Sequence, residues 1–167
     1  SLVTIRVDNR IKEINVGPDS HSITDQTQGN WNGIVGKIEL QSTPEVFFED
    51  IQVYPDLAGK KALVRMNVRA SSSAEGEIAL SARSFNTNVN HEIAPVYQTV
   101  TVRKGDNPLE MELPMGQNFL TWDEFSPALY RLTATLKNGK QIETKQVQFG
   151  MREFTINGKW FYVDGRK

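Results

Sequence analysis

Apolar and polar side chains alternate along several short stretches of the chain. The alternation is clearest in residues 64–69, 78–83, 109–113 and 130–137. A period of two places successive side chains on opposite faces of a β-strand, so each stretch predicts a half-buried strand. No window shows a sustained apolar period of 3.6 residues, and we expect little helix beyond a single turn near residues 122–126.

Turn-forming residues separate these stretches. Gly105-Asp106-Asn107-Pro108 predicts a hairpin connection. Asn138-Gly139 is the strongest short hairpin signal, because a type I′ turn needs positive φ at both central positions. Asn157-Gly158 and Asp164-Gly165 add two turn signals near the C-terminus.

Seven strand candidates lie between residues 44 and 149, and the first spans residues 46–54. Seven short strands in about 100 residues predict an all-β fold, an immunoglobulin-like or fibronectin-like β-sandwich. Residues 1–43 add at least two predicted strands around a polar loop, and residues 150–167 form a short tail. Neither flanking piece is long enough to bury a core alone.

Composition and charge exclude several classes of protein. The net charge is −1, from 19 basic and 20 acidic residues, which argues against a broad nucleic-acid surface. No apolar run approaches the roughly 20 residues that cross a bilayer, so we expect no membrane partner. Cysteine is absent, which excludes disulfides and thiolate catalysis. The two histidines, His21 and His91, lack the spacing of a metal site or a triad and are expected to be surface or turn residues.

Three local patterns together resemble glycoside hydrolase family 2, which includes β-galactosidases, β-glucuronidases and β-mannosidases. Residues 25–40 are similar to the end of the family's sugar-binding jelly roll, where an aromatic loop leads through Gly33-Ile34 into a last strand. Residues 122–130 are similar to a Trp…Pro-x-Leu-Tyr stretch late in its sandwich domain. Residues 149–152, followed by a predicted hairpin, resemble its junction with the catalytic barrel. The three patterns occur in the family's domain order.

The resemblance implies a division of the chain into three parts. Residues 1–43 would be the C-terminal remnant of a jelly roll, residues 44–149 the immunoglobulin-like sandwich, and residues 150–167 a lead-in hairpin to a barrel that the chain does not contain. Tyr130 is expected to bind backbone as a tyrosine corner, and Trp122 and Phe125 to close the end of the sandwich. The structural junction residues are then Trp122, Pro127, Tyr130, Phe149, Gly150 and Arg152.

The same resemblance places the catalytic groups outside the chain. Retaining glycosidases use two carboxylates about 5 to 5.5 Å apart, and in family 2 both are glutamates on barrel strands. We therefore expect no catalytic residue, no metal and no cofactor here, and an inactive fragment of a β-galactosidase-like enzyme that hydrolyses O-glycosidic bonds.

One loop could contact carbohydrate. Its candidate substrate-binding residues are Asp25, Gln26, Trp31 and Asn32, which combine an aromatic face with hydrogen-bonding groups. Thr27 stands where a related motif has an acidic residue, and the alternative is that this loop only packs a domain junction.

Two functions from different classes remain open at this point. The first is a non-catalytic spacer domain that contacts a jelly roll and a barrel within one enzyme. The second is an autonomous module that binds carbohydrate or protein. Orphaned jelly-roll strands would also allow self-association through their edges. The resemblance implies a parent enzyme that is periplasmic or secreted.

Overall fold

The computed structural model describes residues 2–8 and 33–166. The chain divides into two units, Ser1–Gln41 and Ser42–Lys167, and each is described by itself. The described part of the first unit, residues 2–8 and 33–41, forms no strand. Of the strands expected within residues 1–43, none forms at residues 2–7, although apolar and polar residues alternate there. The apolar side chains of this segment are exposed, Leu2 to 92%, so they pack against no core that would stabilise a strand.

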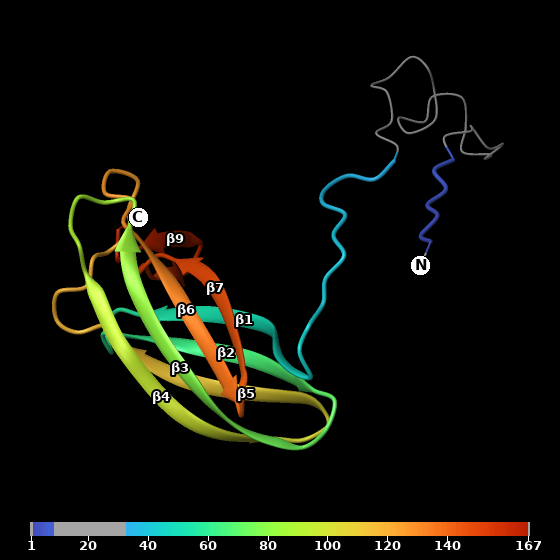
Figure 1. The fold of residues 1–167 in the computed structure, drawn as a ribbon. Coiled ribbons are helices and arrows are strands. Elements are labelled where there is room, and N and C mark those ends of the chain that lie inside the picture. Colours follow the sequence, from blue (N-terminus) through green and yellow to red (C-terminus); the bar gives the residue numbers. More distant parts are fainter. Residues whose placement is uncertain (1, 9–32, 167) are drawn as a thin grey trace, which may run out of the picture. The chain divides into compact units, whose positions relative to one another are not determined.

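The second unit contains an antiparallel β-sandwich (Figure 1). Its seven strands are β1 (Val46–Asp56), β2 (Lys61–Ala70), β3 (Ala74–Phe85), β4 (Glu92–Val102), β5 (Gly105–Pro114), β6 (Leu129–Asn138) and β7 (Gln141–Phe149). One sheet has the order β1-β2-β5 and the other the order β4-β3-β6-β7. The described residues contain no helix. The predicted all-β sandwich and its count of seven strands are confirmed.

The core lies between the two sheets and is built from the alternating positions that the sequence marks. On β2, Val64 and Val68 are 0% exposed and Met66 is 3% exposed, while Arg65 and Arg69 point to solvent. On β6, Leu132 and Ala134 are fully buried in the same way. Full burial of one large aliphatic side chain stabilises a fold by about 1.5–3 kcal/mol, so the period of two fixes which face of each strand is inward.

Three tight turns follow the predicted signals. Asn138 pairs with Gln141, so the loop of the first hairpin is Gly139-Lys140, and only Gly139 has positive φ, at 56°. Glycine with positive φ at the first central position indicates a type II′ turn rather than the expected type I′ turn. The hairpin of β8 (Phe154–Asn157) and β9 (Trp160–Val163) repeats this pattern with Gly158-Lys159. Asp164-Gly165 has positive φ at both residues, the signature of a type I′ turn.

One turn prediction is wrong. Residues 105–108 lie inside β5, and β4 and β5 belong to different sheets, so no hairpin joins them. The Asn107 side chain explains the misleading signal, because it makes turn-like hydrogen bonds from within the strand. Its Oδ1 accepts from the Arg103 N–H at 2.8 Å, and its Nδ2 donates to the carbonyls of Arg103, Gly105 and Val68 at 2.8, 3.0 and 3.1 Å.

Candidate functional site at the C-terminal junction

The predicted substrate-binding residues Asp25, Gln26, Trp31 and Asn32 lie outside the described residues. Their role stays a prediction. The junction residues, in contrast, are all described, and they gather at the end of the sandwich where β6 begins and β7 ends.

Trp122 is the centre of this junction. Its N–H donates to the carbonyl of Met151 at 2.9 Å, and it forms an antiparallel bridge with Pro127. The Arg152 guanidinium lies 4.8 Å from the centre of the indole ring, a cation–π contact. Backbone and side chain together thus tie residues 121–127 to the segment that follows β7.

Gly150 allows this close approach. A Cβ at that position would lie 3.0 Å from the Trp122 Cβ and 3.2 Å from its Cγ. A side chain at this position would be tightly packed against Trp122, and the backbone conformation of Gly150 is not an unusual one. Around it lies a hollow of about 390 Å³, lined by Trp122, Leu129, Gln148, Phe149, Gly150 and Arg152.

Tyr130 holds the underside of the junction. The residue is 0% exposed, and its ring stacks on Phe149 with centroids 5.5 Å apart. Its hydroxyl oxygen accepts the Leu120 N–H at 2.8 Å, so the expected bond from this tyrosine to upstream backbone is present. Burial raises the pKa of the Tyr130 phenol, which keeps it neutral.

His91 lies in the connection between β3 and β4, directly before β4, so its expected place in a turn segment is confirmed. It is half-buried, however, and not a plain surface residue. Its Nδ1 lies 2.7 Å from the Tyr130 hydroxyl oxygen, and the two rings meet edge to face. Sequence spacing could not reveal this pair, because 39 residues separate the two side chains.

Asp123 organises the turn beside Trp122. Its Oδ1 accepts the N–H groups of Ser126 at 2.7 Å and Phe125 at 2.8 Å. These bonds, with a smaller contribution from Arg166, lower the pKa of the Asp123 carboxyl. The turn directs Phe125 outward, where it is 85% exposed, so the expectation that Phe125 closes the sandwich end is wrong.

The β8–β9 hairpin is tied to the sandwich through this turn. Arg166 Nη2 lies 3.4 Å from Asp123 Oδ2. At the base of the hairpin, Asp164 Oδ1 accepts the Glu153 N–H at 2.6 Å, and the Asp164 N–H donates to the Glu153 carbonyl at 2.9 Å. Only a weak sequence signal points to these contacts, namely an aspartate two residues before Phe125 and another in the Asp-Gly turn.

One face of the hairpin is apolar and exposed. Phe154, Ile156 and Phe161 lie on the same face by strand alternation and register, and they are 62%, 66% and 61% exposed. The rings of Phe154 and Phe161 stack at 5.5 Å. The hairpin therefore presents a small, exposed apolar face.

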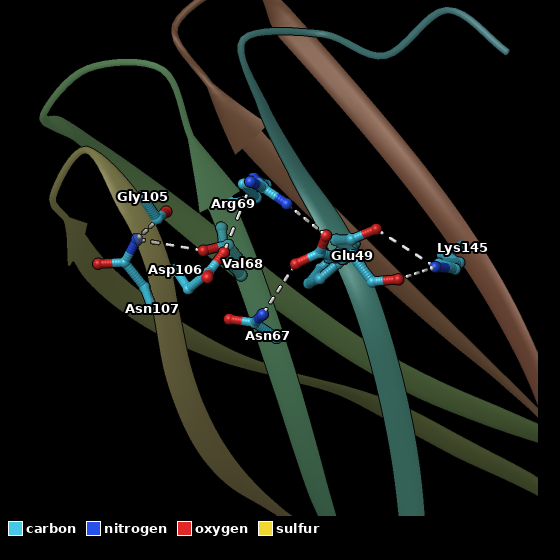
Figure 2. Close-up of polar contacts among 9 residues, drawn as sticks. Glu49, Asn67, Val68, Arg69, Gly105, Asp106, Asn107 and Lys145 are labelled. Carbon is cyan, nitrogen blue, oxygen red and sulfur yellow. Dashed lines mark hydrogen bonds and ion pairs between the residues drawn. The ribbon is translucent and has the colours of Figure 1, made fainter.

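A second polar cluster joins the two sheets at a β-bulge in β1 (Figure 2). Glu49 Oε1 binds Arg69 Nη1 at 2.7 Å, and its Oε2 accepts from Asn67 Nδ2 at 3.0 Å. From the other sheet, Lys145 Nζ donates to the carbonyl of Glu49 at 2.8 Å and to that of Phe48 at 3.2 Å. The bulge thus has its backbone groups bound by side chains of the facing sheet.

Glu143 completes this inter-sheet contact. Its Oε2 accepts the Phe48 N–H at 2.7 Å. Burial raises the pKa of the Glu143 carboxyl, while the Phe48 N–H and Lys145 oppose the shift. Since β1 and β7 are both edge strands, these side chains cover one open side of the sandwich, which is a structural role.

Neither cluster supplies a metal site. In residues 2–8 and 33–166, no group of three or more histidine, cysteine or acidic side chains is placed to hold an ion. Within the same residues, no helix is long and apolar enough to cross a membrane.

Comparisons with known proteins identify the sandwich. No curated protein sequence matches the chain. Among solved structures, a glycosyl hydrolase family 2 member from Bacteroides cellulosilyticus has a TM-score of 0.59 at 18% identity, over 74% of this chain and 18% of its own. A Parabacteroides merdae β-glucuronidase has a TM-score of 0.54 at 22% identity, over 74% and 16%. An Eisenbergiella tayi β-galacturonidase has a TM-score of 0.55 at 22% identity, over 74% and 21%.

These likenesses support the fold, and the chain spans about a fifth or less of each of these structures. The family itself is shown by sequence. The model of glycosyl hydrolases family 2 matches residues 46–152, from the first residue of β1 to Arg152 beside Trp122. With the match covering more than half of its length and ending in the junction described above, the chain belongs to glycosyl hydrolase family 2.

Proposed function

We propose that this chain is a non-catalytic connecting domain of a larger family 2 glycoside hydrolase. The observation that carries the proposal is the β8–β9 hairpin, which is tied to the sandwich through Arg166 and Asp123 yet exposes an apolar face. A domain that orients a neighbour needs both an attachment to its own core and a surface for the neighbour to cover.

The neighbour is proposed to be the catalytic domain of the same enzyme. The Trp122–Met151 backbone bond and the contact of Arg152 with the Trp122 ring support a set direction for the chain as it leaves the sandwich, and Gly150 allows their close approach. Such a domain acts by holding parts of the enzyme in a fixed relation, and precise positioning of groups is worth a large share of a catalysed rate.

The parent enzyme is proposed to hydrolyse O-glycosidic bonds. A β-galactosidase-like specificity is the finer prediction from sequence. The solved structures described above include a β-glucuronidase and a β-galacturonidase, but at 22% identity they support the fold of this chain and not a sugar. Assays of the full-length enzyme with nitrophenyl β-galactoside and nitrophenyl β-glucuronide would separate these sugars.

The connecting role is tested by comparing one substitution in two contexts. Phe161→Ser should change the free energy of unfolding of the isolated 167-residue chain by no more than about 0.5 kcal/mol, because the side chain is largely exposed there. In the full-length enzyme the same substitution should lower both thermal stability and kcat/KM, because Phe161 would be covered by the neighbouring domain.

Ile142→Ser is the matched control. Ile142 is 66% exposed, like the hairpin residues, but lies on β7 away from the hairpin. It should have little effect in either context. Turnover of nitrophenyl glycosides by the pure 167-residue chain, or an unchanged full-length enzyme carrying Phe161→Ser, would contradict the proposal. Carbohydrate binding that is lost on Trp31→Ala, without any effect of the hairpin, would favour the autonomous binding module instead.

A further inference from the structure

The outer face of the β4-β3-β6-β7 sheet contains a hollow of about 900 Å³ that the connecting role does not use. Its lining comes from all four strands and lies at the end where β4 begins and β3 ends. We propose that this hollow is a binding site for a carboxylated sugar.

The hollow exists because of a break in strand pairing. Leu80 pairs with Val96 and Ala82 with Ile93, so Ser81 faces two residues, Ala94 and Pro95, instead of one. Such a bulge bends its strand and redirects side chains. The bulge residues Ala94 and Pro95 line the hollow beside Ser81 and Thr133.

The floor offers neutral hydrogen-bonding groups in one row. Ser81 pairs with Thr133 across β3 and β6, and Thr133 pairs with Gln146 across β6 and β7. Gln146 Nε2 donates to Thr133 Oγ1 at 3.2 Å, which orients both groups. Hydroxyl and amide side chains both donate and accept, which suits the hydroxyl groups of a sugar ring.

The next row carries an uncompensated charge. Arg83 and Arg131 are directly paired across β3 and β6, and like charges at paired positions are unfavourable. Glu92 neutralises Arg83, with Arg83 Nε and Glu92 Oε1 3.2 Å apart. Arg131 pairs on its other side with the neutral Gln148, and no carboxylate among the described residues lies in salt-bridge distance of it. The lining therefore holds two arginines against one glutamate.

Phe85 holds the Arg131 fork in place. The guanidinium carbon lies 4.9 Å from the centre of the Phe85 ring. A stacked guanidinium keeps its N–H groups available in one plane, a geometry that matches the two oxygens of a carboxylate. A ring with several hydroxyls and one carboxylate thus meets the Ser81–Thr133–Gln146 row and the Arg131 fork at once.

The test is an NMR titration of the ¹⁵N-labelled 167-residue chain at constant ionic strength. The probes are digalacturonic acid, the neutral galactobiose of the same linkage, and inorganic sulfate. Digalacturonic acid should shift amide signals of the lining residues and bind with a dissociation constant in the millimolar range, more tightly than galactobiose. Arg131→Gln should weaken the binding of digalacturonic acid by about fivefold or more, so that it no longer binds more tightly than galactobiose.

Two further variants keep the result interpretable. Thr133→Val keeps a β-branched side chain but removes the hydroxyl group, so it should weaken the binding of both sugars. Arg103→Gln removes an exposed arginine beyond the other end of β4 and should change nothing. The amide spectrum of each variant also shows that it folds.

The proposal is overturned by several outcomes. Equal affinity for both sugars would remove the role of the carboxylate. Sulfate that binds as well as digalacturonic acid would reduce the hollow to a simple anion site. Arg103→Gln acting like Arg131→Gln would show diffuse attraction, and the absence of shifts in the lining would show that no site exists.

Discussion

Removal of the Tyr130 hydroxyl group tests how the junction is held. Tyr130→Phe keeps the ring and its stacking on Phe149, so no large cavity forms and the cost is confined to hydrogen bonds. The Leu120 N–H loses its acceptor in a half-buried position, and an orphaned polar group of this kind costs about 1–3 kcal/mol. His91 Nδ1 also loses a partner, but its half-buried ring can be hydrated in compensation. We expect a total loss of about 1.5–3 kcal/mol.

The assay is urea unfolding followed by tryptophan fluorescence. With an unchanged urea m-value of about 2 kcal/mol per molar, a loss of about 2 kcal/mol lowers the unfolding midpoint by about 1 M. Tyr97→Phe is the control, because Tyr97 is 64% exposed on β4 and its change should stay within about 0.5 kcal/mol. Equal midpoints for Tyr130→Phe and Tyr97→Phe would refute the reasoning that the buried hydroxyl organises the junction.

Two more substitutions address the close approach at Gly150 and the buried carboxyl of Glu143. Gly150→Ala should destabilise by about 1–2 kcal/mol in the same assay, since overpacking against the backbone-anchored Trp122 outweighs the smaller gain of about 0.4–1 kcal/mol from a stiffer unfolded chain. Gly59→Ala should cost less, because its Cβ would meet the movable end of the Asp56 side chain, and a larger loss there would contradict this reasoning. Glu143 has a raised pKa in the folded state, so its stabilising contribution is complete below the ordinary value of 4.5 and is lost as the pH rises through the folded pKa. The free energy of unfolding of the wild type, measured relative to Glu143→Gln, should therefore fall as the pH rises above about 4.5, and a flat or rising difference would exclude the assigned cause.

Strand faces were predictable because they follow from local alternation. The buried residues of β2 and β6 are the ones that the period of two selects, and the turns at Gly139, Gly158 and Gly165 fall at their Asn-Gly or Asp-Gly signals. The type of the turn at Gly139 depends on strand register. Because Asn138 pairs with Gln141, the central residues are Gly139 and Lys140 and not Asn138 and Gly139. Asn107 shows the limit, because the same side-chain hydrogen bonds serve a turn or a crossing between sheets.

The sequence by itself therefore determined the class of fold, the inward faces of the strands and, through three ordered patterns, the family. Tertiary structure decided the contacts between residues far apart in the chain. The pair of His91 and Tyr130, the attachment of Arg166 to Asp123, and the row of Arg83 and Arg131 all depend on which strands become neighbours. Periodicity carries no information about strand pairing, because it indicates only which face of a strand is buried.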